Sequence, residues 1–315
     1  MISENLIEIK NLKKHFYIDR KMVLKAVDGI SFNIKKGETF GLIGESGCGK
    51  TTCGRTILGL YKATSGEVFM DGTDIQKLHN RDKKNFAKKC QIIFQDTYSS
   101  LNPRITLRDI IGEGIDIHNI YRGNEREEKI NRILEITGLD KAYGSMFPHE
   151  FSGGQRQRIV IARALSVEPE FIVCDEPVSS LDVSMQAQII NLLVKLQKEL
   201  GLTYLFISHD LSVIRYISHR VGVMYLGHIV ELGDKEDIYE NPMHPYTKAM
   251  LSAIPNINKE AGHKVMLKGE LETPINPKPG CRFANRCIHS KEICYTETPE
   301  LKKKTNSHFV ACHLY

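Results

Sequence analysis

The chain has 315 residues, of which 41% are hydrophobic and 26% charged, and its formal net charge is +5. This length allows one large domain or two smaller ones, and the composition is ordinary for a soluble globular protein. The charge is too mild to indicate a nucleic-acid partner, and we expect none. No stretch approaches the roughly 18 uninterrupted apolar residues of a membrane span, and the N-terminal sequence MISENLIEIK has no apolar core typical of a secretory signal. We therefore expect a cytosolic chain that reaches any membrane through partners.

The N-terminal part of the chain predicts a small β-rich region followed by a strand, a loop and a helix. Short alternating stretches, LIEIK, VLKAVDGISFNI and ETFGLIG, are separated by Asp-Gly and Lys-Gly pairs, which are typical of turns. ETFGLIG leads into a glycine-rich loop, and KTTCGRTILGL then has helical spacing. A second hairpin is expected around residues 66–72.

The middle of the chain predicts an α/β fold with an inserted helical subdomain. TLRDIIGEGIDI and EREEKINRILEIT, between residues 106 and 139, carry apolar residues at helical spacing. Helices and buried strands then alternate, which indicates a mostly parallel sheet covered on both faces. The expected elements are helices at 155–165, 184–200 and 211–217 and strands at 171–174 and 203–208.

The composition changes near residue 241, where we place a domain boundary. NPMHPYTKAMLSAIP predicts a short amphipathic helix, and LETPINPKPG, rich in proline, leads into a cluster of cysteines. We therefore expect a nucleotide-binding domain at 1–240, with its helical subdomain at about 99–150, and a C-terminal extension at 241–315. A single phosphate-loop motif indicates one nucleotide-binding unit in the chain.

The sequence GESGCGKT at residues 44–51 fits the phosphate-loop pattern G-x-x-x-x-G-K-[ST] and lies between an expected strand and an expected helix. Its glycines let backbone N–H groups turn toward phosphate oxygens, and the helix N-terminus adds positive partial charge. Lys50 is expected to contact the β- and γ-phosphates and Thr51 to bind Mg²⁺. The predicted ATP-binding residues are Gly44, Glu45, Ser46, Gly47, Cys48, Gly49, Lys50, Thr51 and Thr52.

A buried strand, FIVCDEP, ends in two carboxylates. Ligands of open parallel sheets lie at the carboxyl ends of strands. We expect Asp175 to hold Mg²⁺ through water and Glu176 to act as the general base that polarises the attacking water. Many strands end in acidic residues, so this motif is informative only because it follows a phosphate loop.

A second anion-binding helix start is expected at FSGGQ, where Ser152 is a candidate N-cap and two glycines open the helix. One nucleotide does not need two such helix ends far apart along one chain. The second end is useful if it covers the nucleotide that a partner subunit holds. The motif therefore predicts a face-to-face dimer.

Taken together, these motifs resemble those of the ATP-binding cassette (ABC) family. The signature begins with Phe151 where that family more often has leucine, an exchange of one apolar residue for another. Phe16, beside Tyr17, fits the position of the aromatic that stacks on adenine. The other matches are the phosphate loop, the Q-loop residue Gln95, the signature Ser152, Gly153, Gly154 and Gln155, the Walker B pair Asp175 and Glu176, the D-loop residue Asp182 and the switch histidine His209.

The resemblance implies an ATPase in which two cassettes close over shared nucleotides. Glu176, His209 and Gln95 are then the catalytic residues, and Gln95 joins Thr51 and Asp175 as a Mg²⁺ ligand. Hydrolysis would loosen the dimer. Gln95 would report the state of the γ-phosphate to the transport partner.

Four further segments are similar to the ATPases of oligopeptide/dipeptide importers, and most to their F-type subunits: QDTYSSLNPR, PHEFSGGQRQRI, DEPVSSLDVSMQAQIINLL and HPYTKAMLSAIP. This likeness covers essentially the whole chain. It implies a second, D-type ATPase subunit in a heterodimer, two transmembrane permease subunits and an extracytoplasmic peptide-binding protein. It also implies a peripheral position on the cytoplasmic face of the cell membrane.

Other functions stay open at this point. Nickel and other small-solute importers share this ATPase subfamily. A non-transport ABC ATPase is disfavoured, because repair and chromosome members carry a long coiled coil and translation members carry two cassettes, and this chain has neither. A purely regulatory subunit would be expected to lack Glu176 or His209, and both are present.

Eight cysteines occur, and four of them gather in the C-terminal extension. Cys48, Cys53, Cys90 and Cys174 are expected to be small buried hydrophobes. Four cysteines concentrated in one cytosolic tail favour a metal site, and the resemblance to peptide-importer ATPases implies a [4Fe–4S] cluster, with Zn²⁺ or four free thiols as alternatives. The nearby histidines are expected at the surface. The candidate ligands are Cys281, Cys287, Cys294 and Cys312, and the histidines are His289, His308 and His313.

Overall fold

The computed structural model describes residues 4–253 and 273–315. The chain divides into two compact units. The first unit comprises Met1–Ile34, Thr39–Gln76 and Phe206–Tyr315, and the second comprises Lys35–Glu38 and Lys77–Leu205. In the described residues, no helix is both long enough and apolar enough to cross a membrane.

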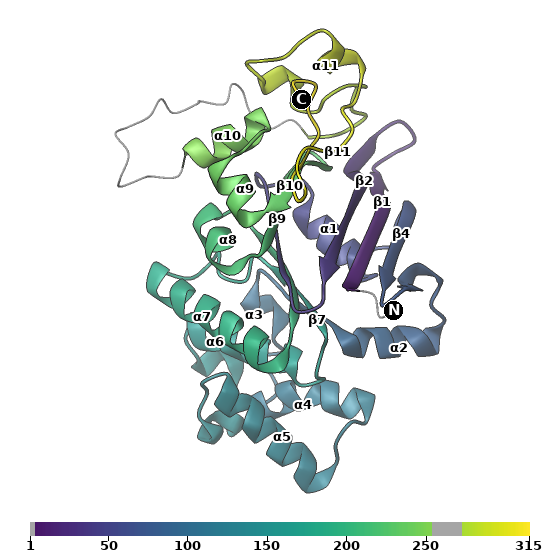
Figure 1. Ribbon diagram of the computed structural model, residues 1–315. Helices are drawn as coiled ribbons and strands as arrows, with labels where there is room; N and C mark the ends of the chain where they lie inside the picture. Colours follow the sequence, from purple (N-terminus) through teal and green to yellow (C-terminus); the bar gives the residue numbers. More distant parts are fainter. Residues whose placement is uncertain (1–3, 254–272) are drawn as a thin grey trace. The chain divides into compact units, whose positions relative to one another are not determined.

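The first unit contains an antiparallel sheet built from the N-terminal strands. β1 and β2 lie next to each other as long strands (Figure 1), in the order β2-β1-β4-β5. β1 pairs with β4 so that Ile9 faces Val68, and both side chains are buried. The strands are β1 (Asn5–Tyr17), β2 (Val23–Lys35), β4 (Ser65–Met70) and β5 (Thr73–Asp74).

A second group of strands in the first unit carries the phosphate loop and the C-terminal extension. It has the order β11-β12-β10-β9-β3, in which β3 and β9 are parallel and β10 and β12 are antiparallel. The strands are β3 (Thr39–Ile43), β9 (Arg220–Tyr225), β10 (His228–Asp234), β11 (Lys302–Lys303) and β12 (Phe309–Val310), and the helices are α1 (Lys50–Ile57), α8 (Leu211–Ile217), α9 (Lys235–Glu240), α10 (Pro245–Ser252), η4 (Ala284–Arg286) and α11 (Ile293–Thr296).

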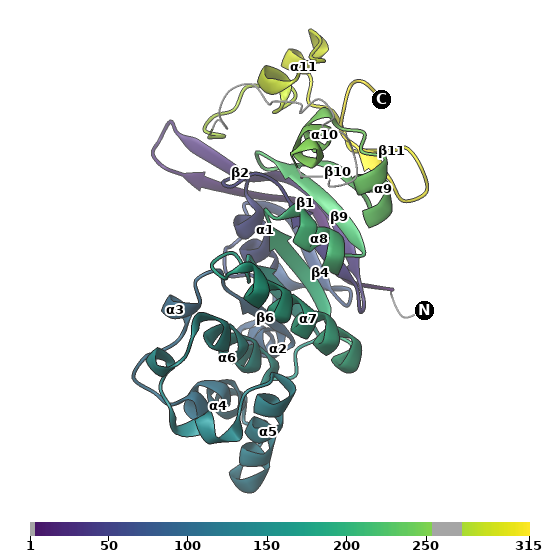
Figure 2. The same cartoon turned by 90° about the vertical axis from the view of Figure 1, so that its left-hand side faces the viewer.

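The second unit is mostly helical around a parallel strand pair. β6 and β7 pair in parallel with Ile92 opposite Val173, and Figure 2 shows α4 and α5 beside α6. η1 (Ile75–Lys77) and β8 (Thr203–Ser208) span the sequence boundaries of the two units. The remaining elements are α2 (Asn80–Lys89), β6 (Cys90–Ile93), α3 (Thr97–Ser100), α4 (Leu107–His118), α5 (Gly123–Ile136), η2 (Lys141–Ser145), η3 (Pro148–Glu150), α6 (Gly153–Leu165), β7 (Phe171–Asp175) and α7 (Val183–Leu200).

Most of the elements expected from periodicity are confirmed, including β8 and α8, whose bounds agree at both ends. α6 begins earlier than expected, at Gly153, because Ser152 caps it. The hairpin around residues 66–72 is formed by β4 and β5. The short amphipathic helix expected after residue 241 is α10. The first residues of the proline-rich stretch LETPINPKPG lie outside the described residues.

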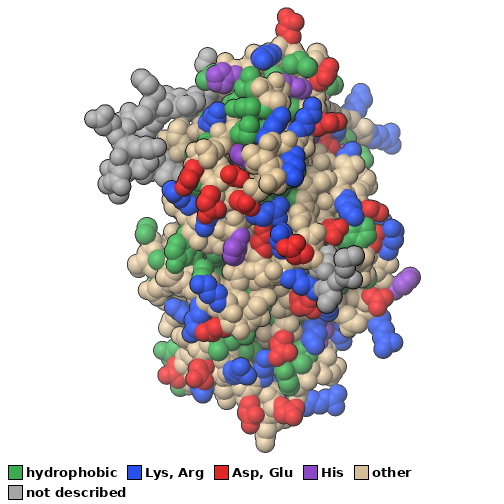
Figure 3. Space-filling view, in the orientation of Figure 1, with side chains coloured by type: hydrophobic (Ala, Val, Ile, Leu, Met, Phe, Trp, Pro, Cys, Tyr) green, Lys and Arg blue, Asp and Glu red, His purple; other side chains and the backbone are tan. Residues whose placement is uncertain are grey.

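Cys48, Cys53, Cys90 and Cys174 are buried, as expected from the sequence. Burial raises the pKa of Cys53 and of Cys174 well above the ordinary value, so both remain protonated packing residues. On the face drawn in Figure 3, Lys and Arg side chains are interspersed with Asp and Glu. The mild positive charge is therefore spread over this face and not gathered into one patch.

Candidate nucleotide-binding site

The phosphate loop connects β3 to α1, and its backbone requires glycine. Gly49, the N-cap of α1, has φ 110°, a conformation that residues with a side chain rarely adopt. A Cβ at this position would lie 2.0 Å from the carbonyl oxygen of Ala26. The loop can therefore pack against the end of β2 only with glycine here.

Lys50 places a cation inside this loop. The side chain is buried, and Nζ donates to the carbonyl oxygens of Gly44, at 2.7 Å, and Glu45, at 3.0 Å. The first turn of α1 contains no acidic residue, so the positive end of the helix is not neutralised by its own side chains. A buried cation, a helix N-terminus and a loop shaped by glycine form a site suited to a polyphosphate.

Glu45 is the acidic residue of this loop, and an arginine of the C-terminal extension binds it. Arg286 Nη1 lies 2.6 Å from Glu45 Oε2, and Nη2 lies 3.0 Å from Oε1. The hydrogen bond to Glu45 raises the pKa of Arg286 above its ordinary value. This pair cannot be predicted from the sequence, because no local pattern links residues separated by 241 positions.

The carboxylate pair and the Q-loop glutamine meet in the second unit. Asp175 ends β7 and is buried, and Glu176 follows with φ 48°, which is a strained conformation for a non-glycine residue. Gln95 Nε2 donates to Glu176 Oε2 at 3.1 Å. The structure thus brings together two of the three predicted catalytic residues. Their roles in catalysis stay predictions.

The predicted Mg²⁺ ligands are a hydroxyl, an amide and a carboxylate. Oxygen atoms of these kinds suit Mg²⁺, which also keeps water and phosphate oxygens as ligands. Thr51 belongs to the first unit, and Gln95 and Asp175 belong to the second. The donor chemistry fits the ion.

The signature segment starts α6 with a capping box. The Ser152 N–H donates to Gln155 Oε1 at 3.0 Å, and Ser152 Oγ accepts from the Gln155 N–H at 3.4 Å. Ser152 and Gly153 are exposed, whereas Gly154 is buried. A Cβ on Gly154 would lie 1.7 Å from Met185 Cε on α7. Ser152 and Gln155 therefore have a structural task, the capping of α6, in addition to any contact with a partner's nucleotide.

The remaining predicted site residues lie at element ends. Asp182 caps α7, and the hydrogen bond from the Met185 backbone N–H lowers its pKa. His209 is exposed directly after β8. The Phe16 ring packs edge-on against Tyr61, with ring centroids 5.6 Å apart. Their roles at the nucleotide also stay predictions.

The four C-terminal cysteines lie in one short segment, and the Cys281 N–H donates to the Cys294 carbonyl oxygen at 2.7 Å. Burial raises the pKa of Cys281 to about 11, and the other three cysteines add to this effect. Within residues 4–253 and 273–315, no group of three or more His, Cys, Asp or Glu side chains is placed to hold a metal ion. The iron–sulfur and zinc interpretations of Cys281, Cys287, Cys294 and Cys312 gain no support from this arrangement.

His308 corrects the expectation that the histidines near these cysteines lie at the surface. It is buried, and its Nε2 lies 2.7 Å from Oε1 of Glu231, which is also buried. Glu231 accepts two further hydrogen bonds, from the backbone N–H groups of Met243 and His244, at 2.6 and 2.9 Å. The buried carboxylate explains the burial of His308, since a charge in the interior needs partners.

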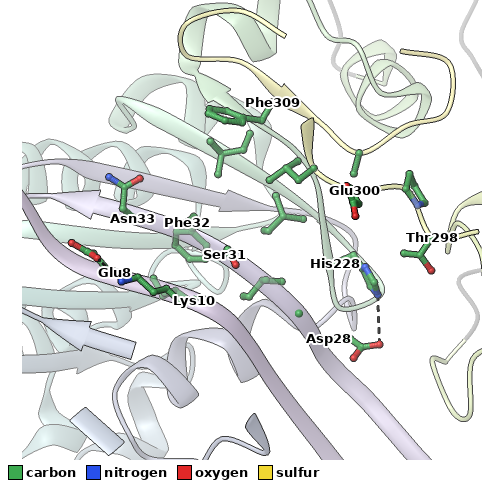
Figure 4. A pocket seen from close by; sticks show the side chains of 18 of the residues that line it. Glu8, Lys10, Asp28, Ser31, Phe32, Asn33, His228, Thr298, Glu300 and Phe309 are labelled. Carbon is green, nitrogen blue, oxygen red and sulfur yellow. Dashed lines mark ion pairs between the residues drawn. The ribbon is translucent and has the colours of Figure 1, made fainter. Parts of the chain in front are cut away.

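A pocket of about 750 Å³ lies between the β1–β2 sheet, β10 and the C-terminal extension (Figure 4). At one end Asp28 contacts His228, at 3.6 Å, His15, at 3.0 Å, and Arg282, at 2.8 Å. Burial alone would raise the pKa of Asp28, but hydrogen bonds to His228 and His15 lower it well below its usual range. Arg282 thus anchors the extension to β2 by a paired, largely buried charge.

Known proteins resemble this chain over nearly its whole length. Residues 27–179 match the family model described as ABC transporter, and residues 230–294 match the C-terminal region of oligopeptide/dipeptide transporters. The oligopeptide transport ATP-binding protein AppF of Bacillus subtilis (strain 168) is 54% identical over 322 residues, covering 99% of this chain and 98% of that protein. OppF of the same strain is 59% identical over 256 residues, covering 81% and 84%.

Solved cassette structures share the fold. CbiO1 of Clostridium perfringens, part of the ABC transporter complex cbiONQ, has a TM-score of 0.68 at 26% identity and covers 76% of this chain and 92% of its own. The dimeric cassette MJ0796 bound to ADP and Pi has a TM-score of 0.65 at 29% identity, covering 73% and 98%. The fold is therefore that of an ABC nucleotide-binding domain, an α/β phosphate-loop ATPase. The chain belongs to the family of oligopeptide/dipeptide ABC transporter ATP-binding proteins.

Proposed function

We propose that this chain binds and hydrolyses ATP to energise a membrane importer of dipeptides and oligopeptides. The supporting observation is the match to oligopeptide transport ATP-binding proteins along nearly the full length of both chains, including the C-terminal extension. The phosphate loop, with its buried Lys50 and its glycine-dependent turn, supplies the ATP site that this activity needs.

Each motif has a proposed task at the nucleotide. The loop N–H groups and Lys50 hold the phosphates, and Phe16 stacks on adenine. Glu176 accepts a proton from the attacking water, and Gln95, which donates a hydrogen bond to Glu176, orients that carboxylate. His209 contacts the γ-phosphate. Bound Mg²⁺ neutralises charge on the β- and γ-phosphates, and Thr51, Gln95 and Asp175 are its proposed ligands.

The exposed start of α6 supports a dimer as the active form. Ser152 and Gly153 present a helix N-terminus to solvent, and we propose that this end covers the γ-phosphate held by a second cassette. MJ0796, a relative in fold, is described as a dimer with ADP and Pi. The proposed partners are a D-type ATPase subunit, two permease subunits and a peptide-binding protein. The proposed location is the cytoplasmic face of the membrane.

Reconstitution tests both the ATPase activity and the solute class. Vesicles containing the assembled importer are supplied with MgATP and the cognate binding protein, loaded with a mixture of short peptides or with Ni²⁺. We expect ATP turnover to rise with the peptide-loaded binding protein and to stay near the basal rate with Ni²⁺. Stimulation by Ni²⁺ instead of peptides would assign the chain to the nickel alternative. Absence of MgATP binding by the wild-type chain would refute the ATPase role.

A further inference from the structure

The C-terminal extension reaches the phosphate loop through one side chain. Arg286 is the last residue of the short helix η4, and its guanidinium donates two parallel hydrogen bonds to the Glu45 carboxylate, of 2.6 and 3.0 Å. The arginine side chain is 10% exposed and the glutamate 30%. A paired, bidentate and largely buried contact of this kind has a defined geometry, unlike most surface ion pairs.

The backbone of Glu45 is fixed by the same part of the chain. Its N–H donates to the hydroxyl of Tyr246 at 2.8 Å, and Tyr246 is fully buried in α10. The Tyr246 ring packs against Phe283 of the extension and against Tyr225 of β9, with centroid distances of 5.5 and 4.7 Å. Glu45 is therefore held at its side chain by Arg286 and at its amide by Tyr246.

Glu45 is in turn a direct neighbour of the cation expected to bind phosphate. Its carbonyl oxygen accepts a hydrogen bond from Lys50 Nζ at 3.0 Å. A shift of Glu45 would therefore move an acceptor that positions Lys50. Consecutive hydrogen bonds thus connect Arg286 through Glu45 to Lys50, and all three residues belong to the first unit.

The charges of Glu45 and Arg286 determine how these contacts affect phosphate binding. Glu45 is the only acidic residue in GESGCGKT, and a carboxylate in an anion-binding loop opposes the binding of phosphate. The guanidinium of Arg286 cancels that charge. Without Arg286 the loop would carry an uncompensated negative charge beside the site. Without the charge of Glu45 no such penalty would arise.

We propose that Arg286 is a positioning residue of the ATP site, through which the C-terminal extension neutralises and holds Glu45 and so makes the phosphate loop competent to bind ATP. The proposal rests on the proposed function, in which residues 44–51 bind ATP. It gives the extension a direct task in nucleotide binding. That task differs from docking to other subunits.

The test is the affinity of the full-length chain for MgATP, measured by isothermal titration calorimetry at low salt. We expect R286Q to raise the Kd about tenfold, because a carboxylate close to the phosphates is no longer compensated. R286K keeps the positive charge but cannot form two parallel hydrogen bonds to Glu45. Its Kd for MgATP should therefore lie between those of R286Q and wild type. In the assembled importer at saturating ATP, R286Q should retain kcat within about twofold, since Arg286 acts on binding and not on the chemical step.

A suppressor separates positioning from a merely structural effect. E45Q added to R286Q removes the uncompensated charge, so the double variant should recover a Kd within about threefold of wild type. A fold weakened by loss of Arg286 would not regain ATP affinity through a second substitution. R282Q is the matched control, because it removes another largely buried arginine of the extension, whose partner is Asp28 and not the loop.

The outcomes distinguish this proposal from the proposed function. If wild type binds MgATP but R286Q binds it equally well, or if E45Q does not restore binding, the positioning role of Arg286 is wrong. An equal loss in R282Q and R286Q would assign the effect to general loosening of the extension and would also refute it. If wild type itself binds no MgATP, the proposed function fails. Thermal melting of each variant shows which of them are folded.

Discussion

The buried histidine at the start of α10 should make the stability of this protein depend on pH. His244 is 1% exposed, and its Nδ1 accepts a hydrogen bond from the Tyr246 N–H at 3.1 Å. Burial lowers the pKa of His244 to about 4, although the charge of Glu231 opposes this effect. The substitution H244N removes the titrating ring but keeps an oxygen acceptor suited to the N-cap position.

The direction and size of the effect follow from linkage. The unfolded chain has an ordinary histidine pKa of about 6.5 and binds a proton between pH 6.5 and 4, whereas the folded chain does not. Stability contributed by the neutral ring is therefore fully present above pH 6.5 and is lost as the pH falls toward 4. The total loss in the free energy of unfolding is about 3 kcal/mol, and about 2 kcal/mol of it has occurred by pH 5.

Urea unfolding at pH 8 and pH 5 measures this loss. The chain has no tryptophan, so far-UV circular dichroism is the suitable probe. Other groups also contribute to the wild-type pH dependence, so the decisive quantity is the difference between proteins. Between pH 8 and pH 5, we expect the free energy of unfolding of H244N to fall by about 2 kcal/mol less than that of wild type. The exposed His289 offers a control, H289N, that should behave like wild type. An H244N protein with the wild-type pH dependence would refute the reasoning.

Three further perturbations test the site and the fold. E176Q should still bind MgATP while turnover falls by at least about 10²-fold, as measured by phosphate release; wild-type turnover would remove Glu176 from the role of base. G49A should lower stability by about 1–3 kcal/mol in thermal melts, because Gly49 has φ 110° and its Cβ would lie 2.0 Å from the carbonyl oxygen of Ala26, whereas G153A should melt within about 1 kcal/mol of wild type. A chain truncated after Glu240 should express mainly as insoluble protein, and a soluble, ATP-binding fragment would show that the core does not need the extension to fold.

Local sequence patterns predicted the elements whose boundaries are set by residues close to them in sequence. β8 is an apolar run, and α8 has helical spacing and an N-cap aspartate, Asp210, which binds two backbone N–H groups of its first turn. Ser152 and Gln155 form a capping box within four residues, which also fixes the start of α6. In each case the residues that determine the boundary are neighbours in sequence, so the pattern is readable without the fold, although the expected helix at 155–165 began two residues later than α6 does.

Contacts between distant residues were not predictable in the same way. The motif GESGCGKT predicts a phosphate loop, but nothing in it indicates that Glu45 pairs with Arg286. His308 was expected at the surface, because a histidine among polar residues usually is, and only the fold shows that Glu231 lies beside it. The concentration of four cysteines in the extension favoured a metal, whereas coordination depends on the directions of side chains, which the sequence does not determine.

Buried charges help to join the extension to the cassette core. Glu231, Asp28 and Glu45 lie in or beside the core strands and the phosphate loop, and each is paired by a residue of the extension: His308, Arg282 and Arg286. Removing one partner of a buried pair costs about 3–5 kcal/mol, because the other charge stays behind without compensation. The docked extension therefore supplies a partner to each of these carboxylates, and Asp28 has His15 and His228 of the core as further partners. Since one of these carboxylates lies in the phosphate loop itself, docking of the extension and readiness of the loop for ATP depend on the same contacts.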